Sequence, residues 1–309
     1  MRILVTGGTG FIGSHVVERL LQARHTLRVM AHSAARLPEL RFIDEQTELV
    51  LGDLSDRSTL RRALDGMEAI VHLAWSTVPK NATADPAFDV QSNVIGTIHL
   101  LEQAREQQLK HFVFISSGGT VYGRPQTDPI PETHPTRPIS AYGLSKLTIE
   151  KYLHLYYELY GLDYTVLRVA NAFGERQNLL KGQGVIGVWL QRIRQGKPIE
   201  IWGDGQVVRD YVYVKDVAEA VAQVLASRSS YAQTFNVGSG HGYSLRQVAA
   251  SLQRVMQAEP DIRYLPGRDF DVPSNVLDIN RIRQSVGWQP QTRFETGIER
   301  VREWLATNF

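Results

Sequence analysis

Two side chains whose chemistry suits acid–base catalysis, Tyr142 and Lys146, lie four residues apart in this chain of 309 residues. On a helix, this spacing places the phenol and the ammonium on one face, with Cβ atoms ~5–6 Å apart. A nearby ammonium favours the phenolate and lowers the tyrosine pKa, as a general base near neutral pH requires. Ser140 suits the N-cap of such a helix, and Gly143 leaves space beside the ring. We therefore predict that Tyr142 and Lys146 are catalytic.

A second tyrosine and lysine with the same spacing, Tyr211 and Lys215, are predicted to be structural. Tyr211 begins the run Tyr-Val-Tyr-Val, whose alternation is typical of a strand. Because four residues of a strand span ~13 Å, these two groups cannot act together.

Small and hydroxylated residues follow a strand-like apolar run in the stretch 115–123, Ile-Ser-Ser-Gly-Gly-Thr-Val-Tyr-Gly. A hydroxyl group of this stretch would donate to the reacting oxygen of a substrate that faces Tyr142. Ser117 and Thr120 are the candidates for this role. The alternative is an ordinary loop without a catalytic function.

A glycine-rich turn near the start of the chain predicts a bound cofactor. The apolar run Ile3–Val5 precedes the turn, and a helical pattern of apolar residues follows it from Val16 to Leu21. In such an arrangement, backbone N–H groups and the helix dipole receive a pyrophosphate. The residues predicted to bind the dinucleotide are Gly7, Gly10, Phe11, Ile12 and Gly13. A turn that binds nothing is the alternative.

The composition is that of an ordinary globular protein and excludes several kinds of site. It is 43% hydrophobic and 21% charged with a net charge of +2, which gives no electrostatic reason for a nucleic-acid or membrane partner. Because there is no cysteine, there is no disulfide, thiolate nucleophile or Cys-ligated zinc. The nine histidines include no HxxxH or HExxH pair, so we expect no metal.

Neither a signal peptide nor a membrane span is expected. The sequence runs directly into its first predicted strand, which leaves no room for a signal peptide before it. No apolar run reaches the ~18 residues of a transmembrane helix. We therefore expect a cytoplasmic protein.

Short apolar runs alternate with helical patterns in the first half, which is typical of a parallel sheet covered by helices. The predicted strands are Arg2–Thr6, Leu27–Ala31, Glu48–Leu51, Ala69–Ala74, His111–Ser116 and Tyr164–Val169. Helices are predicted near 12–23, 57–64, 87–108 and 140–160. These elements predict an α/β fold, a Rossmann-type doubly wound parallel sheet with a smaller C-terminal α/β substrate domain.

The regular alternation ends after Ala170, and the second half is interpreted as a smaller domain. Helical segments near 185–195, 244–256, 280–286 and 294–306 are separated by loops rich in Gly, Pro and Asp. A strand-like Val207–Val214 and a helix 216–226 are expected to return to the main sheet. We assign 1–170 to a dinucleotide-binding domain that 207–240 rejoins. Residues 171–206 and 241–309 are assigned to the substrate domain, over the carboxyl ends of the strands.

Together, the glycine turn, the Ser-Ser-x-x-x-Val-Tyr-Gly stretch and the Tyr-x-x-x-Lys pair resemble the NAD-dependent epimerase/dehydratase family of extended short-chain dehydrogenases/reductases. The resemblance covers essentially the whole chain and implies a nicotinamide cofactor and a nucleotide-sugar substrate. The cofactor contacts that it implies beyond the glycine turn are Asp53, Leu54, Leu73, Ala74 and Asn93, besides Tyr142 and Lys146. The implied substrate contacts are Asn171, Val185, Arg209, Arg268 and Asp271.

The implied substrate contacts agree with the chemistry of the residues. Arg209 and Arg268 offer bidentate donors to a pyrophosphate. Asp271 can orient a guanidinium or accept a hydrogen bond from a ribose hydroxyl. Surface salt bridges are the alternative for both arginines.

Two positions depart from the family pattern. Gly118 stands where the family usually has Ser or Thr, so that the hydroxyl role passes to Ser117, to Thr120 or to water. Ala31 ends the second predicted strand, where an Asp commonly binds the adenosine ribose. NAD is the predicted cofactor, but NADP is not excluded because that carboxylate is missing. The residues that would receive a 2′-phosphate are His32, Ser33 and Arg36.

The resemblance implies oxidation of a sugar carbon, usually C4, to a ketone. Dehydratases of the family carry an Asp-Glu pair where this chain has Gly119 and Thr120, neither of which can act as an acid or base near neutral pH. We therefore predict 4-epimerisation of a UDP-hexose through a transient 4-keto intermediate, with a tightly bound cofactor. An NADPH-dependent reductase of a keto-sugar nucleotide and a non-catalytic dinucleotide sensor are the alternatives. The sequence leaves open whether the hexose is glucose, an N-acetylhexosamine or a uronate.

The resemblance also implies a homodimer. Relatives often pair through two helices, which here lie near 90–108 and 140–160. Leu101, Tyr156 and Leu159 are candidates for the interface, and a place in the buried core is the alternative for each.

Overall fold

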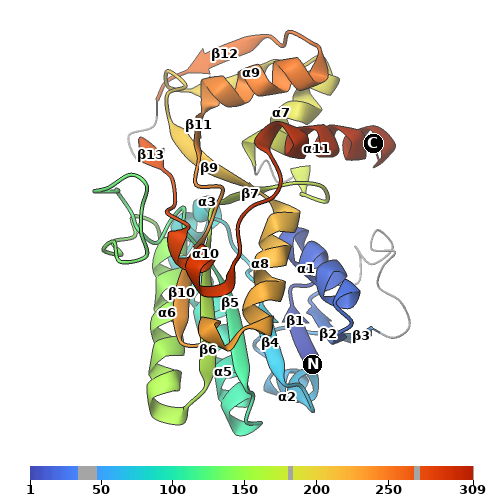
Figure 1. Ribbon diagram of the computed structural model, residues 1–309, viewed down its shortest axis with the longest axis vertical. Helices are drawn as coiled ribbons and strands as arrows, with labels where there is room; N and C mark the ends of the chain where they lie inside the picture. Colours follow the sequence, from blue (N-terminus) through green and yellow to red (C-terminus); the bar gives the residue numbers. More distant parts are fainter. Residues whose placement is uncertain (34–46, 180–183, 268–271, 309) are drawn as a thin grey trace.

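The computed structural model describes residues 1–33, 47–179, 184–267 and 272–308 (Figure 1). It shows a seven-stranded sheet covered by helices and a smaller lobe over one end of that sheet. No helix in this described part of the chain combines the length and the apolar character that a membrane crossing requires. Within the same residues, no group of three His, Cys, Asp or Glu side chains is placed to hold a metal ion.

The strands of the main sheet are all parallel, in the order β10-β6-β5-β4-β1-β2-β3. They are β1 (Arg2–Thr6), β2 (Thr26–Ala31), β3 (Glu48–Leu51), β4 (Ala69–His72), β5 (His111–Ser117), β6 (Asp163–Val169) and β10 (Gln233–Val237). From β1 the chain proceeds outward to β3 and then returns to β4 beside β1. The strand order therefore reverses between β1 and β4, where open α/β sheets bind their ligands. The predicted doubly wound sheet is confirmed.

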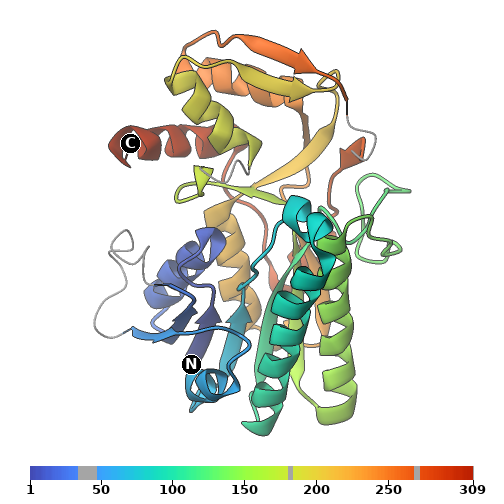
Figure 2. The same cartoon turned by 180° about the vertical axis from the view of Figure 1, so that it is seen from behind.

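Helices cover both faces of the main sheet. They are α1 (Phe11–Gln22) and α8 (Val214–Ala226) on one face, and α2 (Arg57–Leu64), α5 (Gly96–Glu106) and α6 (Ala141–Tyr160) on the other. Alternate residues of β1 face the two resulting cores: Ile3 and Val5 pack with α1 and α8, whereas Leu4 packs with the other helices. Because both faces are buried, the strand is a continuous apolar run. Figure 2 shows α5 and α6 together on their face of the sheet.

The smaller lobe is built around a second sheet, shown in the upper part of Figure 1. This sheet consists of β9 (Val208–Tyr213), β7 (Asn171–Phe173), β11 (Gly242–Ser244) and β13 (Ser274–Asn275). The strands β8 (Ile199–Trp202) and β12 (Ile262–Leu265) form a separate pair, and the helices of the lobe are α7 (Val185–Arg194), α9 (Leu245–Met256) and α11 (Phe294–Asn308). Short helices elsewhere are α3 (Pro79–Ala84), α4 (Pro86–Asp89), a π-helical Val90–Ile95, a 3-10 turn Arg228–Ser230 and α10 (Asn280–Val286).

One predicted strand lies in a different sheet. The prediction that Val207–Val214 returns to the main sheet is wrong, because β9 pairs with β7, β11 and β13 of the smaller lobe. The following elements do return, since α8 packs against α1 and β10 pairs with β6. Alternation predicts the strand but not its neighbours: Val212 faces the core under α8, whereas Tyr211 and Tyr213 face the core of the smaller lobe.

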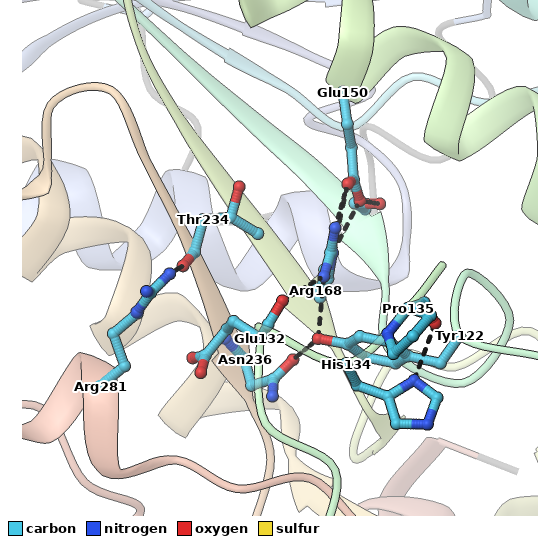
Figure 3. A network of polar contacts seen from close by, with 10 residues as sticks. Tyr122, Glu132, His134, Pro135, Glu150, Arg168, Thr234, Asn236 and Arg281 are labelled. Carbon is cyan, nitrogen blue, oxygen red and sulfur yellow. Dashed lines mark hydrogen bonds and ion pairs between the residues drawn. The ribbon is translucent and has the colours of Figure 1, made fainter. Parts of the chain in front are cut away.

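A buried ion pair holds α6 against β6 (Figure 3). Arg168 of β6 donates to Glu150 of α6 at 2.6 Å, and the two side chains are only 6% and 5% exposed. Arg168 also donates to the Tyr122 hydroxyl at 3.0 Å, and Tyr122 donates to Asn236 of β10 at 2.6 Å. Ser116, near the end of β5, donates to Glu150. These contacts attach the helix of the predicted catalytic pair to three strands of the sheet.

Replacing Arg168 by methionine is expected to lower the free energy of unfolding by about 3–5 kcal/mol, because Glu150 would remain as a buried, unpaired charge. Urea unfolding measures this loss. Arg263→Met is the matched control, since Arg263 pairs with Asp261 at an exposed position, where a lost ion pair changes stability little. Equal losses in the two variants would contradict the role assigned to the buried pair.

Candidate active site

The largest group of predicted site residues lines a cleft of about 590 Å³ at the point where the strand order reverses. Its lining comes from the segments that follow β1 and β4, from the end of β5, from the start of α6, and from the smaller lobe. Catalytic, cofactor and substrate contacts predicted from distant parts of the sequence therefore meet in one space. The cleft is the candidate active site.

The glycine turn lines the cleft with Gly7, Gly10, Phe11, Ile12 and Gly13. Gly7 has a φ of +70°, and a Cβ at this position would lie 2.7 Å from the backbone N of Ala74. A Cβ on Gly13 would lie 2.1 Å from the carbonyl O of Gly7. The close packing of the turn therefore requires glycine at both positions.

The start of α1 fits a negatively charged group. Its N-cap, Gly10, provides no side-chain cap, and the first turn contains no acidic residue. The first amide groups of a helix have no partner within the helix, and the helix dipole favours an anion beside them. The residues present therefore fit the pyrophosphate of a dinucleotide.

Tyr142 and Lys146 both line the cleft from the beginning of α6. The helix begins as predicted, because Ser140 accepts a hydrogen bond from the backbone N of Gly143 at 3.2 Å. Glycine at 143 makes room for the backbone of Thr120, whose carbonyl O would lie 2.6 Å from a Cβ.

The ammonium of Lys146 lies among aromatic rings. Its Nζ donates to the carbonyl O of Ile115 at 2.8 Å and lies 3.7 Å from the centroid of the Trp75 ring. The ring centroids of Phe114 and Tyr142 lie 4.8 Å and 5.8 Å away. Cation–π attraction therefore replaces part of the hydration lost by this side chain, which is only 3% exposed.

Burial shifts the pKa of both members of the predicted catalytic pair. It lowers the pKa of Lys146 to about 7, against the opposing effect of the Asp89 and Glu150 carboxylates. It raises the pKa of Tyr142 above its ordinary value, and Asp89 raises it further. The shift of the Tyr142 pKa is thus upward, opposite to the predicted lowering by Lys146, because burial disfavours the charged phenolate.

The two candidate hydroxyl groups are placed differently. Ser117 lines the cleft together with Tyr142. Thr120 does not line it, and its buried Oγ1 has no hydrogen-bond partner in the described structure. A Cβ on Gly118 would lie 2.5 Å from Cδ1 of Leu277. Leu277 therefore fills the space that a hydroxylated side chain at 118 would need.

The residues predicted to contact the adenosine end lie beyond β2 and β3. His32 and Ser33 are exposed, and His32 Nδ1 lies 3.7 Å from Oδ2 of Asp53. Hydrogen bonds from Ser55 hold the pKa of Asp53 below its ordinary value. Leu54 is 8% exposed and belongs to the core. The predicted contact Arg36 lies outside the described residues.

The remaining predicted cofactor contacts divide between the cleft and the layer behind it. Leu73 lines the cleft, and the backbone N of Ala74 donates to Thr6 Oγ1 at 3.3 Å beside the glycine turn. Asn93 does not line the cleft and is fully buried. Its amide accepts from the backbone N of Ser76 at 2.7 Å and donates to Thr77 Oγ1 at 3.0 Å. Asn93 thus positions the segment that follows β4.

The predicted substrate contacts are only partly brought together. Asn171 and Val185 line the cleft from the smaller lobe. Arg209 does not line it, and its Nη1 donates to the carbonyl O of Val208 at 2.8 Å and of Val272 at 2.6 Å. Arg268 and Asp271 lie outside the described residues.

Tyr211 and Asp89 were not predicted as site residues. Tyr211 lines the cleft, but Lys215 does not line it and forms an ion pair with Glu175 at 3.5 Å, so these two side chains do not meet in the cleft. Asp89, which does not line the cleft, is fully buried and raises the pKa of both Tyr142 and Lys146. The only sequence signal for Asp89 is its place four residues before Asn93, one turn earlier on a predicted helix.

Replacing Lys146 by methionine tests the pKa of the buried ammonium. The lysine of the unfolded chain keeps its proton up to a pKa of 10.5, whereas the folded protein releases it near pH 7. Unfolding therefore takes up a proton between these values, and the contribution of Lys146 to stability becomes more favourable by about 1.4 kcal/mol per pH unit as pH rises through this window. We therefore expect the difference in free energy of unfolding, wild type minus Lys146→Met, to increase as pH rises through this window. Lys151→Met, at an exposed position of α6, is the control, and a difference independent of pH would contradict the assignment.

Comparison with known proteins identifies relatives along the whole chain. The model of the NAD dependent epimerase/dehydratase family matches residues 3–238. The UDP-glucose 4-epimerase of Mycolicibacterium smegmatis is 36% identical over 309 aligned residues, which cover 99% of this chain and 98% of that protein. Nucleotide-sugar enzymes with other activities, a dTDP-4-dehydro-6-deoxyglucose reductase and a dTDP-glucose 4,6-dehydratase, match at 28% and 29% identity.

Solved structures show the same architecture. The UDP-glucose 4-epimerase of Thermotoga maritima, determined with UDP-glucose, is 34% identical, has a TM-score of 0.93 and is matched over 99% of both chains. The UDP-glucose 4-epimerase of Thermus thermophilus, in complex with NAD, is 34% identical with a TM-score of 0.91 over 100% of both chains. With the glycine turn, the cleft and the pair on α6 in place, the chain belongs to the NAD dependent epimerase/dehydratase family.

Proposed function

We propose that the protein interconverts two UDP-hexoses that differ in configuration at C4, with NAD bound in the cleft. The observation that carries this proposal is that Tyr142 and Lys146 share one cleft of about 590 Å³ with the glycine turn. Full-length similarity to UDP-glucose 4-epimerases supports the substrate class.

In the proposed reaction, Tyr142 accepts the proton of the sugar O4 while C4 becomes a ketone, and it returns the proton when the ketone is reduced. Ser117 donates a hydrogen bond to the same oxygen. Lys146 holds the nicotinamide ribose and stabilises the phenolate by its charge. The chemistry that NAD supplies when bound is reversible hydride transfer. The configuration changes because the 4-keto sugar presents its other face before C4 is reduced.

The charges beside the adenosine end support NAD over NADP. His32 is paired with Asp53 at 3.7 Å, and hydrogen bonds from Ser55 hold the Asp53 pKa low. A 2′-phosphate near His32 would therefore lie close to a carboxylate. An NADPH-dependent reductase is the second candidate, because Ala31 leaves no carboxylate at the end of β2 itself.

We also propose that residues 1–170, together with α8 and β10, form the part of the chain that binds the cofactor. Residues 171–206 and 241–309 form the part that binds the substrate.

We further propose that the protein forms a homodimer through α5 and α6. Leu101 is fully buried, and Tyr156 is 6% exposed and donates to Glu102 of α5, so both belong to the core. Leu159, which is 60% exposed, is the one of the three that is free to face a second copy.

Tyr142→Phe is expected to lower the rate of interconversion of UDP-galactose and UDP-glucose by at least ~100-fold, because it removes the proton acceptor. Retained NAD, measured in the purified variant, shows whether the cleft is intact. Tyr160→Phe, a 52% exposed tyrosine at the end of the same helix, is the control and should keep wild-type activity. Near-normal interconversion by Tyr142→Phe would refute the proposal, and stoichiometric consumption of NADPH by the wild type would favour the reductase.

Ser117→Ala and Thr120→Ala distinguish the two candidate hydroxyl groups. Because only Ser117 lines the cleft, its loss is expected to lower kcat by ~10-fold or more, whereas Thr120→Ala should change kcat little. Steady-state kinetics with UDP-galactose measure both. The reverse order of effects would assign the role to Thr120.

A further inference from the structure

A carboxylate that has no role in the proposed reaction is buried against α6, the helix that carries Tyr142 and Lys146. Asp89, the last residue of α4, is fully buried. Its Oδ1 accepts hydrogen bonds from Thr77 Oγ1 and from Asn93 Nδ2, the latter at 2.9 Å. Its Oδ2 accepts from Ser145 Oγ at 2.5 Å. No ion pair joins Asp89 to a lysine or arginine among the residues that the structure describes.

Lys146 is the complementary charge. Ser145, which donates to Asp89, precedes Lys146 on α6. Among the residues that the structure describes, the direct contacts of the Lys146 ammonium are a carbonyl oxygen and aromatic rings, without a carboxylate. Two buried, opposite charges therefore lie close together without direct contact, and an uncompensated buried charge is strongly destabilising.

The other titratable groups around Lys146 cannot replace Asp89 in this role. Glu150, one turn further along α6, is already paired with Arg168 of β6 at 2.6 Å. His72 of β4 lies between Thr6 and Thr97, and burial lowers its pKa to about 3, so it is neutral at physiological pH.

We propose that Asp89 is the buried counter-charge of Lys146, which keeps the ammonium in the cleft and sets the pH range in which Tyr142 and Lys146 act. Its hydrogen bonds with Ser145 and Thr77 also attach the start of α6 to the segment after β4. Asp89 is thus a positioning residue and does not touch the substrate. The inference rests on the proposed function only where turnover is measured.

Loss of the Asp89 charge shifts the pKa values of Tyr142 and Lys146 in the same direction. The Asp89 carboxylate raises the pKa of Lys146, and it raises the pKa of Tyr142 as well. Without it, the phenol loses its proton at lower pH, and so does the ammonium. If activity requires the phenolate and the ammonium, both limbs of the pH profile move toward lower pH.

The first test is the pH profile of kcat/KM for Asp89→Asn with UDP-galactose, compared with the wild type. We expect both limbs to move toward lower pH by about one unit. Asp85→Asn is the matched control, because Asp85 is an exposed N-cap of α4 and asparagine caps a helix equally well. Its profile should stay in place. A uniform loss of activity in Asp89→Asn, with both limbs unmoved, would show a merely structural role and overturn the proposal.

The second test needs neither substrate nor cofactor. The free energies of unfolding of the wild type, Asp89→Asn, Lys146→Met and the double variant form a thermodynamic cycle. If Asp89 balances the charge of Lys146, Asp89→Asn destabilises the wild type more than it destabilises Lys146→Met. Even where Asp89→Asn alone does not fold, the double variant should fold.

Additive losses, or a double variant no more stable than Asp89→Asn, would overturn the proposal. If the wild type does not interconvert UDP-galactose and UDP-glucose, the proposed function fails, and the cycle still decides the role of Asp89.

Discussion

The whole site depends on keeping one ammonium group out of water. Lys146 is 3% exposed, and a charge of this kind costs several kcal/mol to bury unless other groups compensate it. The carbonyl oxygen of Ile115 and the rings of Trp75 and Phe114 provide the part of that compensation that comes from direct contact. They come from β5 and from the segment after β4, whereas the lysine comes from α6. The ammonium is therefore compensated only in the assembled fold.

The reversal of strand order provides the space in which this charge can act. The strands β1 and β4 are neighbours in the sheet. The chain leaves β1 through the glycine turn and leaves β4 through Leu73 and Trp75. The open first turn of α1 and the buried ammonium then lie in the same cleft, at the carboxyl ends of parallel strands. The predicted site for the phosphates of a cofactor and the proposed site for proton transfer thus adjoin without any additional element.

The smaller lobe is joined to this site through β9, which contributes to two cores at once. Val212 packs with the core of the main sheet, and Tyr211 faces the other way, lines the cleft and packs in the core of the smaller lobe. The neighbouring Asp210 is fully buried and accepts hydrogen bonds from the backbone N of Ser239 and Leu277. Leu277 in turn fills the space beside Gly118. These contacts couple the smaller lobe to the ends of the strands that border the cleft.

Most helices and strands could be predicted from the sequence, because local periodicity records which residues of an element face a core. The helix of Tyr142 is an example. Its cap, its apolar spacing and its proposed catalytic pair are all encoded within a few turns, and the structure has the helix at Ala141–Tyr160. The glycine turn is another, since the glycines and the helix that follows are adjacent in the chain.

Local patterns carry no information about long-range pairing or about the total burial of a charge. The sheet that β9 joins, the exclusion of a side chain at Gly118 by Leu277, and the raised pKa of Tyr142 all arise from residues distant in the chain. The same holds for Asp89, whose partners Thr77 and Ser145 come from separate elements. Spacing along the chain thus defined the elements and the candidate chemistry. Packing in three dimensions defined which groups meet, because desolvation and electrostatic energy depend on every neighbour in space.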